Sequence, residues 1–344
     1  MKLGIIGLPV SGKTTVFEAL THEFAHTGDK SEDRLGTIHV PDDRIDALSR
    51  IYQPQKTIYA QVEYFLPGKT GQKNAGDKTE TPWTAVRDMD ALIHVVRNFR
   101  MFGLDAPTPE ADFLQLDQEL ILSDLAVVEK RLERMTAESK KGKPVDAEER
   151  ELLEKAHALL ETETPLRRDP KIAAAPQLRG YAFLSAKPVL VLFNNEDEDT
   201  APPERTETLV REECLVIRGK LEHELAQMSE EEAVDLLAEF DIAASATDRV
   251  IQKSYAVLGL ISFFTVGEDE VKAWTIPTDT PAVEAAGAIH TDIKKGFIRA
   301  ETISYEDLIE AGSMNAAKKK GTLRLEGKTY VVRDGDIINF RFNI

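Results

Sequence analysis

The chain has 344 residues, 42% of them hydrophobic and 30% charged, which is typical of a globular protein of about two or three domains. Its formal net charge of −17 argues against a protein that coats nucleic acid non-specifically, and we expect no sequence-specific DNA binding. No apolar run approaches the roughly 18 residues that span a bilayer, and the single cysteine, Cys214, excludes an intrachain disulfide. We therefore expect a cytoplasmic protein without a membrane partner.

The chain begins with the pattern of a strand, a glycine-rich turn and a helix. Residues 2–6 are an apolar run, as in a buried parallel strand, and residues 13–21 place apolar side chains on one helical face. Strands that alternate with helices indicate an α/β domain with a mostly parallel sheet. The later strands of this sheet are expected at residues 36–40, 59–66, 91–97, 188–193 and about 214–218.

A helical hairpin is predicted between two of these strands. Residues 110–139 carry apolar side chains at spacings of three to five, which is a helical period. Gly142 and Pro144 then break the helix, and residues 146–162 resume the period. The turn between the two helices is basic and contains Lys140, Lys141 and Lys143.

The pattern changes again near residue 264. Segments 271–276 and 296–302 predict strands, residues 282–290 predict a helix, and the alternating end of the chain predicts a last strand. This part is expected to form a small α+β domain of about 80 residues, which is within the usual range for domains. Trp274 and Phe297 are expected in its core.

The first turn of the chain matches a phosphate-binding loop. Gly7, Gly12, Lys13 and Thr14 satisfy the pattern GxxxxGK followed by Ser or Thr, in the required place between a strand and a helix. Glycines let successive N–H groups turn toward phosphates, the helix adds its positive end, and the lysine reaches the β- and γ-phosphates. The threonine hydroxyl, on Thr14, can ligate Mg²⁺. The expected phosphate-binding residues are Gly7, Pro9, Val10, Ser11, Gly12, Lys13, Thr14 and Thr15.

Several motifs resemble those of one family, the YchF/Obg-like ATPases, which are relatives of the Obg GTPases. The opening GLPVSGKTT resembles the start of that family, residues 41–48 resemble its PDPRLDAL stretch, and residues 94–97 resemble its HVVR strand. The C-terminal part is similar to the TGS-type, ubiquitin-like domain of that family. This similarity rests on residues 273–275, 288–292, 295–301, 334–336 and 340–342.

The resemblance implies a P-loop NTPase domain of the Ras-like or Obg-like type, with an inserted helical coiled coil and a C-terminal TGS-like, β-grasp domain. It also implies ATP or GTP with Mg²⁺ as ligands, and a ribosome-associated role in translation or stress. Lys140, Lys141, Lys143 and the TGS-like domain would be the contact surfaces. The expected segments are 1–105 and 176–263 for the NTPase domain, 106–175 for the hairpin and 264–344 for the TGS-like domain.

The two motifs that sense the γ-phosphate depart from the pattern of the family. The threonine of the first switch would fall near Lys30 and Ser31, whereas Thr37 lies after Gly36 in a predicted strand, so we do not expect Thr37 to bind the metal. The second switch requires DxxG after a strand, but residues 62–68 contain no aspartate. Because phosphoryl transfer depends on positioning and charge neutralisation, we expect weak or absent hydrolysis. No catalytic residue is identified.

The base-binding motif leaves ATP and GTP both open. Asn194 and Asp197 occupy the first and fourth places of the NKxD motif of GTPases, with Asn195 in place of the lysine. Asp197 favours guanine, whereas the missing lysine and the NxxE motif of the family favour adenine, so the balance leans slightly to ATP. Gly219 and Lys220 are expected to form the second base-contacting loop. An acidic surface turn is the alternative interpretation of residues 196–199.

Other constellations suggest no separate chemistry. His94 is expected to be packed inside a strand, and residues 222–224 are expected on a helix surface without the second histidine of a zinc motif. One rival hypothesis is a non-catalytic adaptor that has lost nucleotide-dependent switching. Another is a metabolic kinase, for which no acceptor-activating base is evident.

Overall fold

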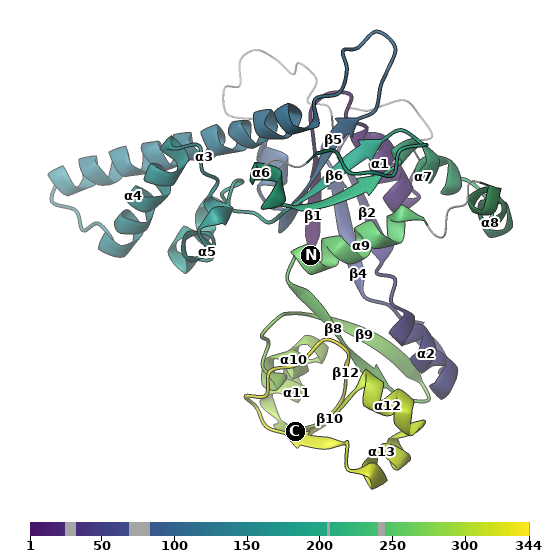
Figure 1. Ribbon diagram of the computed structural model, residues 1–344. Coiled ribbons are helices and arrows are strands. Elements are labelled where there is room, and N and C mark those ends of the chain that lie inside the picture. Colours follow the sequence, from purple (N-terminus) through teal and green to yellow (C-terminus); the bar gives the residue numbers. More distant parts are fainter. Residues whose placement is uncertain (25–31, 69–82, 205–206, 240–244, 344) are drawn as a thin grey trace. The chain divides into compact units, whose positions relative to one another are not determined.

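The computed structural model of the chain describes residues 1–24, 32–68, 83–204, 207–239 and 245–343 (Figure 1). They form two compact units. The first contains residues 1–36 and 63–250, and the second contains residues 37–62 and 251–344. None of the described helices is long and apolar enough to cross a membrane.

The first unit contains a six-stranded sheet in the order β2-β4-β1-β5-β6-β7. From β4 to β7 the neighbouring strands pair in parallel, with Ile6 opposite His94 and Asn98 opposite Asn195. The carboxyl ends of these strands therefore meet at one edge, where ligands bind in open α/β sheets. The strands are β1 (Lys2–Ile6), β2 (Arg34–His39), β4 (Gln61–Leu66), β5 (Ala91–Asn98), β6 (Val189–Asn195) and β7 (Glu213–Ile217).

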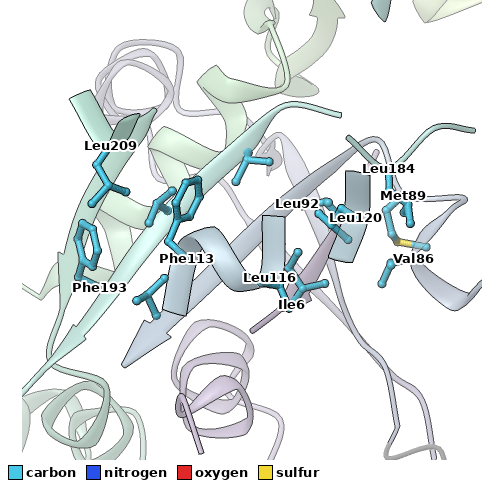
Figure 2. Close-up of a cluster of buried hydrophobic side chains, with 13 residues drawn as sticks. Ile6, Val86, Met89, Leu92, Phe113, Leu116, Leu120, Leu184, Phe193 and Leu209 are labelled. Atoms are coloured by element: carbon cyan, nitrogen blue, oxygen red, sulfur yellow. The ribbon is translucent and has the colours of Figure 1, made fainter. Parts of the chain in front are cut away.

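The core of the first unit lies between this sheet and the beginning of the long helix α3 (Pro109–Lys140). Phe113, Leu116 and Leu120 of α3 are buried against residues of β1, β5 and β6 (Figure 2). Cys214 is half-buried and packs against this cluster. The other helices of the unit are α1 (Lys13–Thr21), η1 (Thr84–Val86), α6 (Glu207–Val210), α7 (Gly219–Leu225), α8 (Glu230–Glu239) and the beginning of α9 (Ala246–Val257).

The second half of α3 extends away from the sheet and packs against α4 (Ala147–Glu161) (Figure 1). The two predicted helices are present, and Asp146 caps α4 by accepting from the N–H groups of Glu148 and Glu149. Lys140, Lys141 and Lys143 are exposed at the turn. The chain returns to the sheet through η2 (Leu166–Arg168), α5 (Pro170–Ala173) and η3 (Pro176–Tyr181).

Charged side chains join the returning segment to α3 and to the sheet. Arg167 donates to both oxygens of Asp117, at 2.8 and 2.9 Å, and to Glu212 at 2.8 Å. Asp124 of α3 is fully buried and accepts from the N–H groups of Leu184 and Ser185. The base of the hairpin is thus fixed by buried, fully paired carboxylates.

The second unit is an α+β structure around a sheet in the order β11-β10-β12-β8-β9-β3. Its core contains Phe263, Phe297 and Phe340, with Trp274 partly buried against them, as expected for Trp274 and Phe297. The strands are β3 (Lys56–Ile58), β8 (Leu260–Val266), β9 (Glu270–Pro277), β10 (Phe297–Ser304), β11 (Arg324–Glu326) and β12 (Asp336–Phe342). The helices are α2 (Asp43–Tyr52), α10 (Ala282–Ile289), α11 (Thr291–Lys295), α12 (Tyr305–Ala311) and α13 (Met314–Lys320).

Residues 37–62 belong to this second unit, although they are far from it in sequence. Strand β3 pairs in parallel with β9, and Arg44 of α2 forms an ion pair with Asp334 at 2.7 Å. The sequence patterns anticipated neither α2 nor β3. The predicted fold class, a P-loop NTPase domain with an inserted helical hairpin and a C-terminal α+β part, is confirmed.

Candidate functional site

The phosphate loop connects the end of β1 to the first residue of α1. Gly7 and Gly12 both have positive φ, at 157° and 92°. A Cβ atom on Gly7 would lie 2.4 Å from the carbonyl oxygen of Val95, and one on Gly12 would lie 2.2 Å from Nδ2 of Asn194. Only glycine fits these two positions, because both the backbone angle and the surrounding space exclude a side chain.

The side chains of Lys13 and Ser11 both lie within the loop. The Lys13 Nζ donates to the carbonyl oxygens of Gly7 at 2.7 Å and Leu8 at 2.8 Å. Ser11 is only 1% exposed, and its Oγ has no hydrogen-bond partner among the described residues. Pro9 and Val10 are exposed, while Thr14 and Thr15 are half-buried in the first turn of α1. A short, glycine-rich turn with a buried unpaired hydroxyl and a lysine folded onto it fits an anionic ligand.

Replacing Gly12 by alanine is expected to destabilise the protein by about 2–4 kcal/mol, because the methyl group displaces the buried amide of Asn194 in addition to straining the backbone. Gly103 provides the matched control, since its φ is 83° but nothing lies within 4 Å of its added Cβ. The Gly103→Ala variant should cost only about 1 kcal/mol, the backbone contribution alone. Urea unfolding measures both values, and equal losses would contradict the steric argument.

Asn194 connects the phosphate loop to the loop that begins α7. Its Nδ2 donates to the carbonyl oxygen of Ser11 at 3.1 Å, and its Oδ1 accepts from the N–H of Gly219 at 2.9 Å. The side chain is 4% exposed. One buried amide therefore fixes the spacing between two loops that lie far apart in the sequence.

Asp197 and Lys220 lie beside this connection. The Asp197 carboxylate accepts from the N–H of Leu221 at 3.2 Å and from Lys220 Nζ at 3.3 Å. Arg218 donates to the Asp197 carbonyl oxygen at 3.4 Å. The structure thus brings together four of the five expected base-binding residues, Asn194, Asp197, Gly219 and Lys220.

Asn195, the fifth expected base-binding residue, turns toward the protein. It is 3% exposed, and its Oδ1 accepts from Asn98 at 2.9 Å. Its Nδ2 donates to the carbonyl oxygens of Asp199 and Ala201. The amide of Asn195 therefore shapes the loop that follows β6.

His94 is packed in the core, as expected. It is 2% exposed and stacks on Phe113 with ring centroids 5.3 Å apart. Burial, together with the nearby charges of Arg167 and Lys13, lowers the pKa of His94 to about 3. The ring is therefore neutral at neutral pH.

Glu222 is not on a helix surface, and that expectation is wrong. The side chain is 1% exposed and accepts from the Ala246 N–H at 2.8 Å and the Thr247 hydroxyl at 2.9 Å, with Ser245 as a further donor. The reason is that the first N–H groups of α9 need an acceptor, and Glu222 of α7 supplies it. The neighbouring His223 is half-buried and hydrogen-bonds Glu18 of α1 at 3.0 Å.

The switch segments are only partly described. Thr37 lies in β2, as expected, whereas Lys30 and Ser31 and residues 69–81 lie outside the described residues. Beyond β4, the Gly68 N–H donates to Asp33 at 2.8 Å. Among the described residues, no group of three His, Cys, Asp or Glu side chains could hold a metal ion.

The comparisons with known proteins agree over the whole chain. The ribosome-binding ATPase YchF of Bacillus subtilis (strain 168) is 36% identical over 364 residues, covering 99% of each chain. Obg-like ATPase 1 of Oryza sativa subsp. japonica is 35% identical and covers 100% of this chain and 92% of that one. Residues 260–343 match the family YchF-GTPase_C, described as a protein of unknown function (DUF933).

The chain belongs to the YchF family.

One solved structure supports the same assignment, and a second shares the fold. The Schizosaccharomyces pombe YchF GTPase has a TM-score of 0.80 and 28% identity, covering 99% of this chain and 97% of that one. A GTP-binding protein from Pyrococcus horikoshii OT3 has a TM-score of 0.55 and 18% identity, which shows a shared fold only. The resemblance to the YchF family drawn from the sequence motifs is thus confirmed.

Sequence reasoning missed some residues that shape the site. Asn98 is a polar residue whose partner lies 97 residues away, and the donors to Glu222 lie 23 to 25 residues away. Phe99 was also missed, although its ring lies 3.9 Å from the place where a Cβ of Gly12 would stand. The apolar residues that follow Phe99 are visible in the sequence, but only the structure shows that Met101, Phe102 and Leu104 are exposed.

Proposed function

We propose that this member of the YchF family is a cytoplasmic purine-nucleotide-binding protein that associates with the ribosome and regulates translation or the response to stress, with weak hydrolysis. The observation that carries the proposal is the phosphate loop, closed at Gly7 and Gly12 and fixed by Asn194 to the loop at Gly219. Relatives are named ribosome-binding ATPases and a GTPase, which supports the ligand class and the partner.

The residues of the phosphate loop fit a nucleoside triphosphate with Mg²⁺. The loop N–H groups and the start of α1 would surround the phosphates, where the helix end adds positive charge. Lys13 would exchange its two carbonyl partners for phosphate oxygens. Thr14 would supply the hydroxyl ligand of Mg²⁺, and the ion would neutralise charge on the phosphates.

Weak hydrolysis is supported by what stands where the second switch begins. If Gly68 is the glycine of the DxxG motif, the place of the aspartate is taken by Phe65, which packs against the apolar core. A phenyl ring cannot hold the water shell of a metal ion. Hydrolysis is therefore expected to be orders of magnitude slower than in a P-loop NTPase with an intact DxxG motif. Fast hydrolysis that depends on Lys13 would contradict the proposal.

The rival hypothesis is an adaptor that has lost useful nucleotide binding. The missing switch aspartate favours this rival, whereas the intact loop geometry at Gly7, Gly12 and Lys13 favours nucleotide binding. Titration calorimetry with ATP and GTP, each with Mg²⁺, separates the two. If neither nucleotide binds, the adaptor hypothesis is the one that remains.

The place of Asp197 supports guanine as the preferred base. Asp197 has the fourth place of the motif in the sequence, and its carboxylate lies beside the start of α7, where it accepts from the N–H of Leu221. A carboxylate there can accept from the N1–H and the exocyclic amine of guanine, whereas adenine presents an acceptor at N1. The names of the relatives, which are mostly ATPases, support the opposite choice.

A base-reading role of Asp197 predicts that GTP binds at least about 10-fold more tightly than ATP, because a lost or repulsive polar contact costs roughly 1–3 kcal/mol. The Asp197→Asn variant should remove most of this preference while leaving ATP affinity nearly unchanged. Asp199→Asn, two residues further on, is the matched control for lost charge. Competition calorimetry measures all three proteins, and tighter ATP binding by the wild type would refute the role of Asp197.

The ribosome is supported as a partner by the basic turn at Lys140, Lys141 and Lys143 and by Lys318–Lys320 at the end of α13. These exposed lysines provide local positive charge on an acidic chain. Contacts of this kind to phosphates weaken as salt rises, because counterions are released on binding. Cosedimentation with purified ribosomes at graded salt tests the partner, and no binding at low salt, with or without nucleotide, would remove it.

A further inference from the structure

The loop between β5 and α3 carries an exposed apolar tip, formed by Met101, Phe102 and Leu104. Met101 is 51% exposed, Phe102 is 105% exposed and Leu104 is 46% exposed. In Figure 1 this loop projects beyond the end of β5, between that strand and the start of α3. Single exposed apolar residues are common on protein surfaces, but a group of three on one projecting loop marks an interaction site.

Hydrogen bonds hold both ends of this loop in place. Arg97 of β5 donates to the carbonyl oxygens of Asp105 at 3.0 Å and Ala106 at 3.4 Å. The Arg100 N–H donates to the Glu196 carboxylate at 2.8 Å. Because the ends of the loop are already held, the apolar tip loses less conformational entropy when a partner covers it.

The apolar tip stands next to the nucleotide-binding loops without being part of them. Phe99, at the root of the loop, lies beside Gly12, and Glu196 belongs to the segment that contains Asp197. The exposed fractions of Met101, Phe102 and Leu104 leave their side chains accessible to a partner. A partner that covers the tip would therefore sit at the same edge of the sheet as the nucleotide.

We propose that the apolar tip inserts into an apolar groove of a ribosomal protein when the chain binds the ribosome. The flanking charges, Arg100 and Asp105, cancel, so the tip offers no net attraction to an RNA backbone. The net charge of −17 opposes an anionic bilayer. Two of the three tip residues, Met101 and Leu104, are flexible aliphatic side chains, which fit a protein groove better than a stacked base, whereas stacking would use Phe102 alone.

This inference rests on the proposed association with the ribosome, and one experiment separates the two. Binding of the full chain to purified 70S ribosomes is measured by cosedimentation at graded salt, with a variant that changes Met101, Phe102 and Leu104 together to serine. The expected loss of affinity is about 30-fold, or about 2 kcal/mol, with an unchanged dependence on salt because no ion pair is lost. Leu122→Ser is the matched control, since Leu122 is 62% exposed on α3 and should bind like the wild type.

Each outcome decides one question. If the wild type does not bind ribosomes at low salt, the proposed function fails before the tip is tested. If the wild type and the triple variant bind equally, the function stands and the role of the apolar tip is refuted. Unchanged thermal unfolding and nucleotide affinity in the triple variant exclude misfolding as the cause of a loss.

Base stacking on RNA is the other explanation that the experiment addresses. Under that explanation Phe102→Trp retains binding, Met101→Ser and Leu104→Ser have no effect, and protein-free ribosomal RNA competes for the chain. Insertion into a protein groove predicts losses from both serine variants and no competition by the free RNA. The first set of results would overturn the inference.

Discussion

The Lys13→Ala variant is expected to bind nucleoside triphosphates at least about 100-fold more weakly than the wild type, since each hydrogen bond from a charged donor contributes roughly 1.5–3 kcal/mol. The ammonium already lies inside the loop, 2.7 Å from the Gly7 carbonyl oxygen and 2.8 Å from that of Leu8. A bound nucleotide would replace these two neutral acceptors by phosphate oxygens, which carry negative charge. Calorimetry with ATP and with GTP, each with Mg²⁺, measures the loss.

Lys2→Ala is the matched control, because it removes the same single positive charge as Lys13→Ala. Lys2 begins β1, has a side chain that is 46% exposed, and pairs with Glu63 at 3.5 Å. Its loss lowers the overall charge equally but removes no group from the loop, so nucleotide affinity should stay within about 2-fold of the wild type. Equal affinity of the Lys13→Ala variant and the wild type would mean that nucleotide does not bind at this loop.

The Arg167→Ala variant is expected to lower the free energy of unfolding by about 3–5 kcal/mol, the usual cost of removing one partner from a buried ion pair. Arg167, Asp117 and Glu212 are all nearly buried, with side-chain exposures of 7%, 10% and 5%. Burial opposes the charge on Arg167, but the carboxylates of Asp117 and Glu212 outweigh it and raise its pKa, so the guanidinium stays protonated. Without it, the Asp117 carboxylate loses its ion-pair partner, and Glu212 keeps only Arg168, at 2.6 Å.

Two further variants test this explanation by urea unfolding. Arg167→Lys keeps the charge but cannot donate to both oxygens of Asp117 and to Glu212 in one plane, so an intermediate loss is expected. Arg134→Ala removes an exposed pair with Glu138 on the same helix and should cost only about 0.3–0.5 kcal/mol. If Arg167→Ala were as mild as Arg134→Ala, the buried network would not stabilise the base of the hairpin.

The sequence by itself determined the parts whose causes are local. Gly7 and Gly12, spaced five apart between an apolar run and a helix, predicted the phosphate loop, and the structure gives both glycines positive φ. The helical periods around Gly142 predicted α3 and α4, because side-chain spacing on a helix depends only on nearby residues. The same motifs predicted membership of the YchF family.

Only the tertiary structure decided which distant residues meet. Asn194 contacts Ser11 across 183 positions, and Glu222 is buried because α9 begins beside it. Residues 37–62 join the C-terminal sheet through β3 and through Arg44, although their local pattern resembles any strand and helix. The physical reason is that hydrogen bonding and ion pairing between distant segments depend on how the chain packs, and periodicity along the sequence carries no record of those partners.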